Sequence, residues 1–350
     1  MKVKLADVCA CESSNLKQSD VINISGKYPV YGATGKIGYI DTYKQEKPYI
    51  AIVKDGAGVG RTYLCDSKSS VIGTLQYILP KENVLPEYLF YVIKHMHLEK
   101  YYSGATIPHI YFKNYKNEEF NLDSINNQET IINILNDCNK LINLRETQLQ
   151  KYDDLIKARF VEMFGDPLIN TKKWKECTIG ELATDVRYGT SKPSVDGGKY
   201  PYLRMNNLTN NGELDLTDLK YIDVSDDEKE KCVVRKGDIL FNRTNSIDLV
   251  GKTTLFNLDE EMIIAGYIIR VRLNSQILPE ILAQYMNSSA LKKLLRKMAK
   301  GAVNQANINA QELQSIKVYV PDLELQNRFS NFVQQVDKSK HDDIRVEYKC

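Results

Sequence analysis

The most regular hydrophobic pattern in the chain lies between Ser124 and Pro167. Starting at Gln128, alternate steps of three and four residues reach mainly apolar side chains over five heptads. This period predicts one long helix that packs along another helix, because it keeps a narrow stripe facing one partner. Ser124 suits a helix start, and Gly165 followed by Pro167 is a stop signal. At 1.5 Å per residue the helix would be roughly 60 Å long and would set a distance between the segments on either side. The seam positions are Gln128, Ile131, Leu135, Cys138, Ile142, Arg145, Leu149, Tyr152, Ile156, Arg159 and Met163.

Residues 1–122 show a different pattern, in which short β-forming stretches are separated by glycine turns. The stretches at 28–40 and 48–64 predict strands joined by hairpins. Residues 85–102 follow with helical spacing, which places Leu89, Val92 and Met96 on one face. This part of the chain is therefore predicted to be a mixed α/β domain that precedes the long helix.

The chain beyond the long helix repeats the motifs that precede it. GKYPVYG at Gly26 corresponds to GKYPYLR at Gly198, and LPEYLFYVI at Leu85 corresponds to LPEILAQYM at Leu278. The offset between the copies grows from 172 to 198 residues through small insertions. Two copies of one unit, each a mixed domain followed by a helix, account for nearly the whole chain. The seam recurs 198 residues after its first four positions, at Gln326, Phe329, Val333 and Val336.

The second helix is predicted to be shorter than the first. Its pattern begins after Asp322 and stops near Lys340, which gives about eighteen residues or roughly 27 Å. We expect over half of the long helix to lack an intramolecular partner. The predicted organisation is a first mixed domain (1–122), the long central helix (123–165), a second mixed domain (166–320), a short second helix (321–340) and a tail (341–350).

Composition places the chain among soluble globular proteins with more than one domain. Of 350 residues, 26% are charged and 43% apolar, and the net charge of +2 requires any nucleic-acid surface to be local. Seven scattered cysteines without a C-x-x-C pair indicate free thiols in a reducing compartment. The N-terminus lacks the apolar core of a signal peptide, and no apolar run approaches membrane-spanning length, so a cytoplasmic protein is expected. His95 and His97 are two residues apart and would lie on different helix faces, so no metal site is predicted.

Three sequence motifs resemble catalytic signatures only in part. GAGVG at Gly56 lacks both the G-x-G-x-x-G spacing and a P-loop lysine, which favours a tight hairpin over a phosphate loop. FGDPLIN lacks the second proline and the aromatic residue of a methyltransferase DPP[YFW] motif, and PDLEL lacks the lysine of a PD...E-x-K nuclease. No catalytic residue is therefore assigned from spacing.

Polar loop residues are the stronger functional signal. Arg and Lys can bind guanine, Asn and Gln can bind adenine, and hydroxyl groups can hold phosphates, so these loops could read DNA bases. Asn, Ser and Thr are also common in turns for backbone reasons, and that alternative holds for any one residue alone. The candidates in the second half are Arg187, Tyr188, Ser191, Lys192, Arg204, Asn206, Arg243, Asn245, Lys252, Asn304 and Gln305, and those at matching places in the first half are Thr34, Lys36, Lys54, Arg61, His109, Tyr111 and Lys113.

The stretch LKKLLRKMAK from Leu291 to Lys300 predicts an amphipathic helix. Its apolar positions, Leu291, Leu294, Leu295 and Met298, would face inward. Its cations would either form a solvated face or contact several DNA phosphates. The cations are Lys292, Lys293, Arg296, Lys297 and Lys300.

These features together resemble the specificity (S) subunit of type I restriction-modification systems. The resemblance rests on the duplicated architecture, on GATIPHI at Gly104 and NQANIN at Asn304, each ahead of a short strand and a capped helix, on the LPEYL-type helices, and on KARFVEMFGDP at the end of the long helix. It covers residues 1–340 and implies an α+β fold. Two repeated mixed α/β target recognition domains would be separated by long helices that form an antiparallel coiled-coil-like pair.

The resemblance also implies a function. Each domain would read one half of a bipartite double-stranded DNA sequence, and the helices would dock two modification (methyltransferase) subunits. The chain itself would be non-catalytic and hold no cofactor, because S-adenosylmethionine, ATP and Mg²⁺ would belong to the modification and restriction subunits of this bacterial defence complex. The expected docking residues are Ile131, Leu135, Ile142, Leu149, Tyr152, Ile156, Phe160 and Met163.

The short second helix departs from the family pattern. We expect a chain truncated or frame-shifted near Lys340, with the seam from about Arg145 to Met163 exposed and available for self-association. Two alternatives remain. One is a self-sufficient DNA methyltransferase or nuclease, against which the missing motifs argue, and the other is a coiled-coil scaffold without a DNA function.

Overall fold

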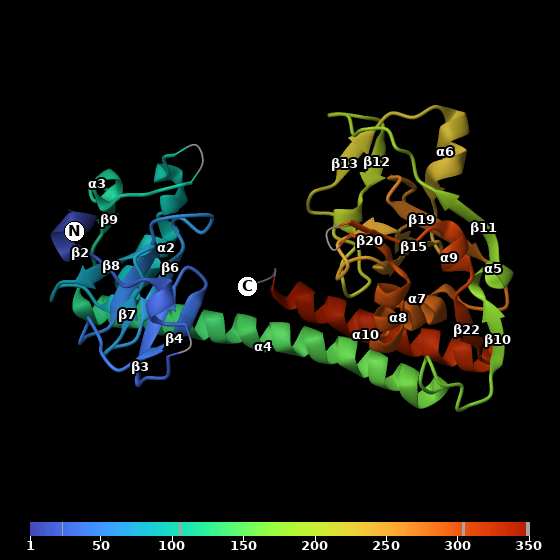
Figure 1. Ribbon diagram of the computed structural model, residues 1–350, viewed down its shortest axis with the longest axis horizontal. Helices are drawn as coiled ribbons and strands as arrows, with labels where there is room; N and C mark the ends of the chain where they lie inside the picture. The colour runs from blue at the N-terminus through green and yellow to red at the C-terminus, as the bar shows by residue number, and fades with distance from the viewer. Residues whose placement is uncertain (23, 105–106, 303–304, 348–350) are drawn as a thin grey trace. The chain divides into compact units, whose positions relative to one another are not determined.

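The structure is a computed structural model that describes residues 1–22, 24–104, 107–302 and 305–347, with residue 302 and residues 341–347 described for the backbone only. The chain forms two compact units, residues 1–145 and 146–350. The boundary falls inside helix α4 (Ile125–Phe164), which is the long helix that the heptad pattern predicts (Figure 1). Ser124 Oγ accepts a hydrogen bond from the N–H of Asn127 at 3.4 Å. Gly165 adopts a φ of +88° directly after the helix, so both predicted end signals are confirmed.

The first unit is built from short strands and helices. They are β1 (Lys2–Lys4), α1 (Leu5–Val8), β2 (Cys9–Ser13), η1 (Gln18–Asp20), β3 (Tyr28–Gly32), β4 (Gly35–Ile40), β5 (Tyr49–Val53), β6 (Thr62–Cys65), β7 (Ser70–Val71), β8 (Leu75–Pro80), α2 (Pro86–His95), η2 (Leu98–Tyr101), α3 (Phe112–Tyr115) and β9 (Glu119–Asn121).

Two sheets and one ribbon organise these strands. The larger sheet is antiparallel with the order β2-β8-β5-β6, and the smaller has the order β4-β3-β7 with β3 and β7 parallel. Strand β1 pairs with β9 as an antiparallel ribbon. The five residues of β5 are all buried, because alternate side chains enter two different cores. Ile50 and Ile52 pack with α2, whereas Tyr49 and Val53 pack with the smaller sheet.

The second unit contains the remaining elements. They are β10 (Lys175–Thr178), α5 (Ile179–Leu182), β11 (Ala183–Tyr188), β12 (Tyr200–Leu203), η3 (Met205–Asn207), β13 (Lys220–Ile222), α6 (Asp226–Cys232), β14 (Val233–Val234), β15 (Ile239–Asn242), β16 (Thr244–Asn245), β17 (Thr253–Leu255), β18 (Met262–Ile264), β19 (Ile268–Leu273), α7 (Pro279–Asn287), α8 (Ser289–Met298), β20 (Lys300–Ala302), β21 (Gln305–Asn307), α9 (Ala310–Gln314), β22 (Lys317–Val320) and α10 (Leu323–Glu347).

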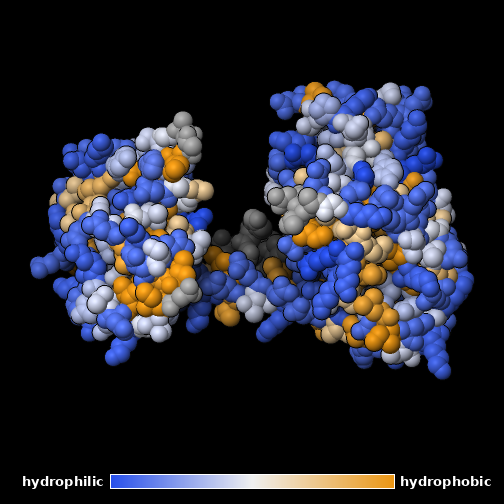
Figure 2. All heavy atoms as spheres, in the orientation of Figure 1, coloured by the Kyte–Doolittle hydropathy of each residue, from blue (hydrophilic) through white to orange (hydrophobic). Residues whose placement is uncertain are grey.

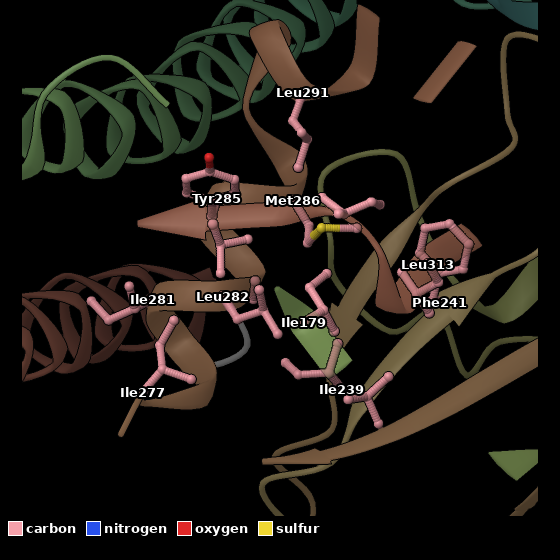
Figure 3. Close-up of a cluster of buried hydrophobic side chains, with 14 of the residues drawn as sticks. Ile179, Ile239, Phe241, Ile277, Ile281, Leu282, Tyr285, Met286, Leu291 and Leu313 are labelled. Atoms are coloured by element: carbon pink, nitrogen blue, oxygen red, sulfur yellow. The ribbon is translucent and has the colours of Figure 1, made fainter. Parts of the chain in front are cut away.

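The second unit repeats the strand order of the first. One four-stranded sheet, β11-β19-β15-β17, matches β2-β8-β5-β6, and in a second four-stranded sheet, β13-β12-β18-β14, strands β12 and β18 are parallel, as β3 and β7 are. The central strand β15 again serves two cores, since Ile239 and Phe241 enter one and Leu240 the other. Figure 3 shows the larger of these cores, where Leu282 and Met286 of α7 lie near Ile239 and Ile179. The duplication that the sequence motifs predict is thus present in the topology.

Helix α10 packs on the C-terminal part of α4 within the second unit. The Phe329 ring lies 5.5 Å from the Phe160 ring and 5.5 Å from the Phe164 ring, in edge-to-face contacts. One turn beyond this cluster, the Phe332 ring accepts a cation–π contact from Arg159 at 5.9 Å. Near the end of the described side chains, the ammonium of Lys340 pairs with the carboxylate of Asp153.

The predicted end of the second helix is wrong, because α10 continues past Lys340 to Glu347. Residues 341–347 contain neither Pro nor Gly, and extending an existing helix by one hydrogen bond per residue is easy when no stop signal intervenes. The apolar heptad stripe therefore ends near Lys340, but the helix itself continues to Glu347.

The prediction that the seam from Arg145 to Met163 is exposed is also wrong. Ile156 and Phe160 are 5% and 4% exposed, and Tyr152 and Met163 pack against the same core. The reason is that α10 and α7 together cover this part of α4. Among the other expected docking residues, Ile131, Leu135 and Leu149 are half-buried and Ile142 is exposed. The exposed apolar side chains of α4 in the first unit are Ile125, Ile134, Leu141, Ile142 and Leu144.

Three general expectations bear on the class of protein. Six of the seven cysteines are free thiols, and Cys350 lies outside the described residues. Within the described ranges, no helix is long and apolar enough to cross a membrane. The same residues contain no group of three or more His, Cys, Asp or Glu side chains arranged to hold a metal ion.

Candidate nucleic-acid interface

In the first unit, three candidate residues gather around the turn between β3 and β4. Thr34 is exposed in the turn, and Lys36 follows it on β4. Arg61 Nη1 donates a hydrogen bond to the carbonyl oxygen of Ala33 at 3.0 Å, and the Tyr63 hydroxyl donates to the same oxygen at 2.8 Å. This shared acceptor holds the guanidinium of Arg61 beside the turn while the residue stays exposed.

A second group of candidates lies where the loop after β5 meets the segment before α3. Asp55 Oδ1 is 2.6 Å from His109 Nδ1, and the His109 ring stacks on Tyr111 with centroids 6.5 Å apart. Lys113 Nζ lies over the Tyr111 ring at 5.3 Å. The carbonyl oxygen of Lys54 accepts a hydrogen bond from the N–H of Ile110 at 2.9 Å, which fixes the two segments together. Tyr111 is 49% exposed, which leaves part of its ring accessible to a stacking base beside His109 and Lys113.

The same place in the second unit is built around Arg243. The N–H of Ile308 donates to the carbonyl oxygen of Arg243 at 2.9 Å, just as Ile110 donates to Lys54. The Arg243 guanidinium lies 4.9 Å from the centroid of the Tyr188 ring, a cation–π contact. The Tyr188 hydroxyl in turn accepts a hydrogen bond from the N–H of Ala310 at 2.8 Å. Arg243 Nη1 also donates to the Gly266 carbonyl at 3.4 Å.

The two places differ in the side chains that they present. Thr244 Oγ1 donates to Asn307 Oδ1 at 2.8 Å in the second unit, at the positions that Asp55 and His109 occupy in the first. Asn245 lies beside this pair and donates to Asn242 Oδ1 at 3.2 Å. An imidazole–carboxylate pair and an amide–hydroxyl pair offer different donors and acceptors to a base edge. The same framework therefore presents two different sets of side chains.

Several other candidates are tied to carboxylates. Arg187 Nε is 2.8 Å from Asp185 Oδ1, and Arg204 Nη2 is 2.7 Å from Asp218 Oδ2. The Lys192 ammonium pairs with Glu228, and this bond together with one from Thr190 lowers the pKa of the Glu228 carboxyl. Lys36 is 3.4 Å from Asp66. A DNA phosphate would have to compete with these carboxylates for the cations. The cations are therefore less available to bind DNA than the sequence alone suggests. Ser191, which follows β11, and Asn206, in η3, are both exposed.

Helix α8 confirms the predicted inward side chains but not all of the outward ones. Leu291 and Leu295 are buried, whereas Lys293 and Lys297 are exposed. Lys292, expected to face outward, is instead half-buried with Nζ 3.5 Å from the Gly251 carbonyl oxygen. The reason is that its position on the helix turns it toward the loop before β17. Arg296 lies 3.8 Å from Asp248, and Lys300 pairs with Glu312 at 2.5 Å.

Lys252 and Lys292 form a partly desolvated pair of cations. Burial lowers the pKa of Lys252. Burial, together with the charges of Lys252 and Arg296, lowers the pKa of Lys292 to about 8. Among the described residues neither lysine forms an ion pair with a carboxylate. Two such lysines side by side favour a bound anion, and a DNA phosphate would supply it.

Asn304 and Gln305 are the last two candidates of the second unit. Gln305 is exposed on β21, and Asn304 lies outside the described residues. Sequence reasoning missed Asp55, Tyr63, Thr244 and Asn307, which contact candidate residues directly. The repeat alignment offers a signal for Asp55 and Thr244, since each directly follows a candidate cation. Figure 2 shows hydrophilic side chains over most of the drawn surface of each unit, so polarity alone would not single out these places.

Comparison with known proteins identifies the family. The model for the type I restriction modification DNA specificity domain matches residues 1–151 and 171–347. The chain belongs to this family. Both units fall within the matched ranges, as the internal duplication requires.

Curated relatives of the chain are themselves specificity subunits. A protein of Methanocaldococcus jannaschii, named as a type I restriction enzyme MjaX specificity subunit, is 28% identical over 168 residues. The type I restriction enzyme EcoKI specificity subunit of Escherichia coli K12 is 26% identical over 180 residues. Each match covers 47% of this chain and 39% of the relative, so less than two thirds of either relative is represented.

Solved structures with the same fold come from type I systems as well. The S subunit from M. genitalium matches with a TM-score of 0.55 at 17% identity, covering 99% of this chain and 91% of that one. A second solved chain, from a structure that addresses complex assembly and conformational transition of the type I R-M system, matches with a TM-score of 0.52 at 16% identity. The match covers 100% of this chain and 93% of that one. At these identities the likeness concerns the fold.

Proposed function

We propose that this chain is a sequence-specific DNA-binding subunit in which each unit reads one half of a bipartite target. One observation carries the proposal: the two units build the same site twice, with Ile110 bound to Lys54 in one and Ile308 bound to Arg243 in the other. Each site then presents different side chains to a ligand, as two readers of different half-sites must. Membership of the DNA specificity domain family supports this assignment.

The proposal extends to the assembly. The two target recognition domains are joined by α4, and an antiparallel pair of α4 and α10 would hold them at a fixed separation, which specifies a fixed gap between half-sites. Two modification subunits would dock on these helices, and restriction subunits would join through them. The chain would be non-catalytic, with S-adenosylmethionine, ATP and Mg²⁺ bound only by the partner subunits. The names of the curated relatives support the role of a specificity subunit.

The decisive experiment selects duplexes from a random pool with the purified complex of this chain and its modification subunits. A bipartite motif with a fixed gap is expected, and inserting one base pair into the gap should abolish selective binding. The logarithm of the affinity should fall linearly with the logarithm of salt concentration, with a slope set by the number of phosphate contacts. A pool without enrichment, or binding of S-adenosylmethionine to the isolated chain, would contradict the proposal.

A further inference from the structure

The first unit carries an open apolar groove of about 610 Å³ beside the N-terminal part of α4. Side chains from α2, β9 and α4 line it, and its apolar wall includes Val92, Phe120, Ile131 and Leu135. This volume lies in the range of sites that bury a ligand of substantial size. The groove contains none of the candidate DNA-binding residues.

The internal repeat shows what fills the equivalent place in the second unit. There the side chains corresponding to Val92, Asn121 and Ile131 are Tyr285, Tyr319 and Phe329. The end of α4 lies against them, and the void that remains is only about 10 Å³. Both rings of the occupying segment, Phe160 and Phe164, contact Phe329 at centroid distances of 5.5 Å.

Polar contacts also fix the occupying segment in the second unit. The Tyr285 hydroxyl donates to the carbonyl oxygen of Pro167, and the Tyr319 hydroxyl donates to that of Leu168 at 3.2 Å. The indole N–H of Trp174 donates to the carbonyl oxygen of Phe164 at 3.0 Å. In the second unit this groove is therefore filled by a helix end that carries two aromatic rings four residues apart and is followed by a turn.

The heptad seams of α4 and α10 also differ in how far they are covered. In α10, Val336 is 6% exposed because α4 covers it, and Lys340 pairs with Asp153. The corresponding residues of α4 in the first unit are Cys138, which is exposed, and Ile142, which is 54% exposed. The stripe that is covered in one copy of the unit is therefore open in the other.

We infer that this groove binds the end of an amphipathic helix from a partner protein, which carries two aromatic side chains four residues apart. The helix would run antiparallel to α4, with its aromatic pair on Ile131 and Leu135 and its preceding turns along Cys138 and Ile142. On the rim, His95 can donate a hydrogen bond to a carbonyl oxygen at a helix C-terminus, whereas Lys100 pairs with Glu118 at 2.5 Å and His97 Nδ1 lies 3.3 Å from Glu99. The inference concerns a protein partner and does not depend on the reading of DNA.

The residue at position 142 distinguishes the partner from a second copy of this chain. In the second unit, Asp153 stands seven residues before Phe160 and meets the cation of Lys340. In the first unit the position of Lys340 is taken by Ile142, which would leave an Asp unpaired at an apolar contact. The occupant should therefore carry an apolar residue seven positions before its first aromatic residue, which the sequence of α4 itself does not.

The test uses the full chain and labelled 20-residue peptides with the sequence of residues 149–168, with binding followed by fluorescence anisotropy. The Asp153→Leu peptide should bind with 1:1 stoichiometry and at least tenfold more tightly than the unaltered peptide. Replacing both aromatic residues of the peptide by alanine (F160A/F164A) should abolish binding. Trp174 is the only tryptophan, and its emission should stay constant, because exchange at the second unit would disturb its bond to Phe164.

A matched pair of chain variants locates the site. Leu135→Arg should abolish binding, whereas Ile134→Arg, which adds the same charge one position away and outside the groove, should leave it unchanged. Thermal unfolding and DNA affinity measured on both variants separate loss of the groove from loss of the fold or of DNA recognition. Equal binding to both variants, no binding of the Asp153→Leu peptide, or a dimer of the chain alone that Leu135→Arg dissociates would overturn the inference.

Discussion

The side chain of Gln128 accepts a hydrogen bond from the N–H of Leu85 through Oε1 at 2.8 Å. Its Nε2 donates to the carbonyl oxygens of Asn83 and Asp123, so the buried amide has no unused strong donor or acceptor group. Gln326 makes the same three bonds in the second unit, to Leu278, Gln276 and Pro321. Each glutamine joins the first turn of a long helix to the start of the helix that packs beside it.

Replacing Gln326 by leucine should therefore destabilise the second unit. The N–H of Leu278 and two carbonyl groups would lose their partners in a buried place, at a cost of about 1 to 3 kcal/mol for the unpaired donor alone. Denaturant unfolding monitored by Trp174 fluorescence would measure the change in the free energy of unfolding. Gln335→Leu, at an exposed position of the same helix, is the control and should be nearly neutral. Equal effects of the two substitutions would show that the buried bonds contribute little.

The same glutamines show how far the sequence predicts the fold. Gln128 and Gln326 open matching heptad patterns, and motifs such as GKYPVYG and GKYPYLR align the copies, so local pattern suffices to predict the long helix and the duplication. Local sequence pattern does not predict which elements distant in the sequence pack against each other. That α7 and α10 cover Tyr152 and Met163 follows from packing.

The candidate site shows the same division. The loops that hold Lys54 and Arg243 could be predicted from their repeated positions. The ion pair between Lys192 and Glu228 joins residues 36 positions apart, and the local sequence around neither residue predicts it. The half-buried position of Lys292 likewise depends on the loop at Gly251, which helical periodicity does not describe.

Removing the two exposed lysines of α8 tests their role in phosphate binding. The double variant Lys293→Ala/Lys297→Ala should weaken DNA binding roughly ten- to hundredfold at 0.1 M salt, equally for all sequences, and reduce the salt slope by about 2. Lys172→Ala/Lys338→Ala removes the same charge from exposed positions outside α8 and should have a much smaller effect. Binding isotherms at several salt concentrations measure both. An unchanged slope would mean that α8 presents only a solvated face.

His109 is expected to govern the sequence that the first unit reads. His109→Asn gives this unit the residue type that Asn307 supplies at the equivalent place, and it breaks the contact with Asp55. Selection from a random pool should then show a change in one half of the bipartite motif and none in the other. His97→Asn, at an exposed site away from this cluster, is the control. A motif unchanged in both halves would exclude His109 from base recognition.

The depressed pKa of Lys292 predicts how stability depends on pH. Its ammonium loses a proton near pH 8 in the folded chain, whereas the ordinary lysine pKa of 10.5 applies in the unfolded chain. Between these values the unfolded state binds more protons, so this group makes the free energy of unfolding rise with pH, by at most about 3 kcal/mol. Lys292→Met removes the titration. The difference in unfolding free energy between wild type and variant, measured from pH 7 to 10, should therefore change in favour of the wild type. A constant difference would place Lys292 in water.

The seam of α10 is covered more fully than the first part of the seam of α4. Equivalent substitutions in the two seams should therefore lower the free energy of unfolding by different amounts. Phe329 is fully buried between Phe160 and Phe164, so Phe329→Ala should destabilise the second unit by about 3 to 5 kcal/mol. Ile131 stands at the same position of the first unit but faces the open groove, and Ile131→Ala should cost only about 1 kcal/mol, because less apolar surface leaves water when that unit folds. Denaturant unfolding of both variants gives the comparison. Adding the partner that covers the groove should raise the cost of Ile131→Ala toward that of Phe329→Ala, because the site then resembles its filled counterpart. Equal costs without any partner would mean that the first seam is already packed.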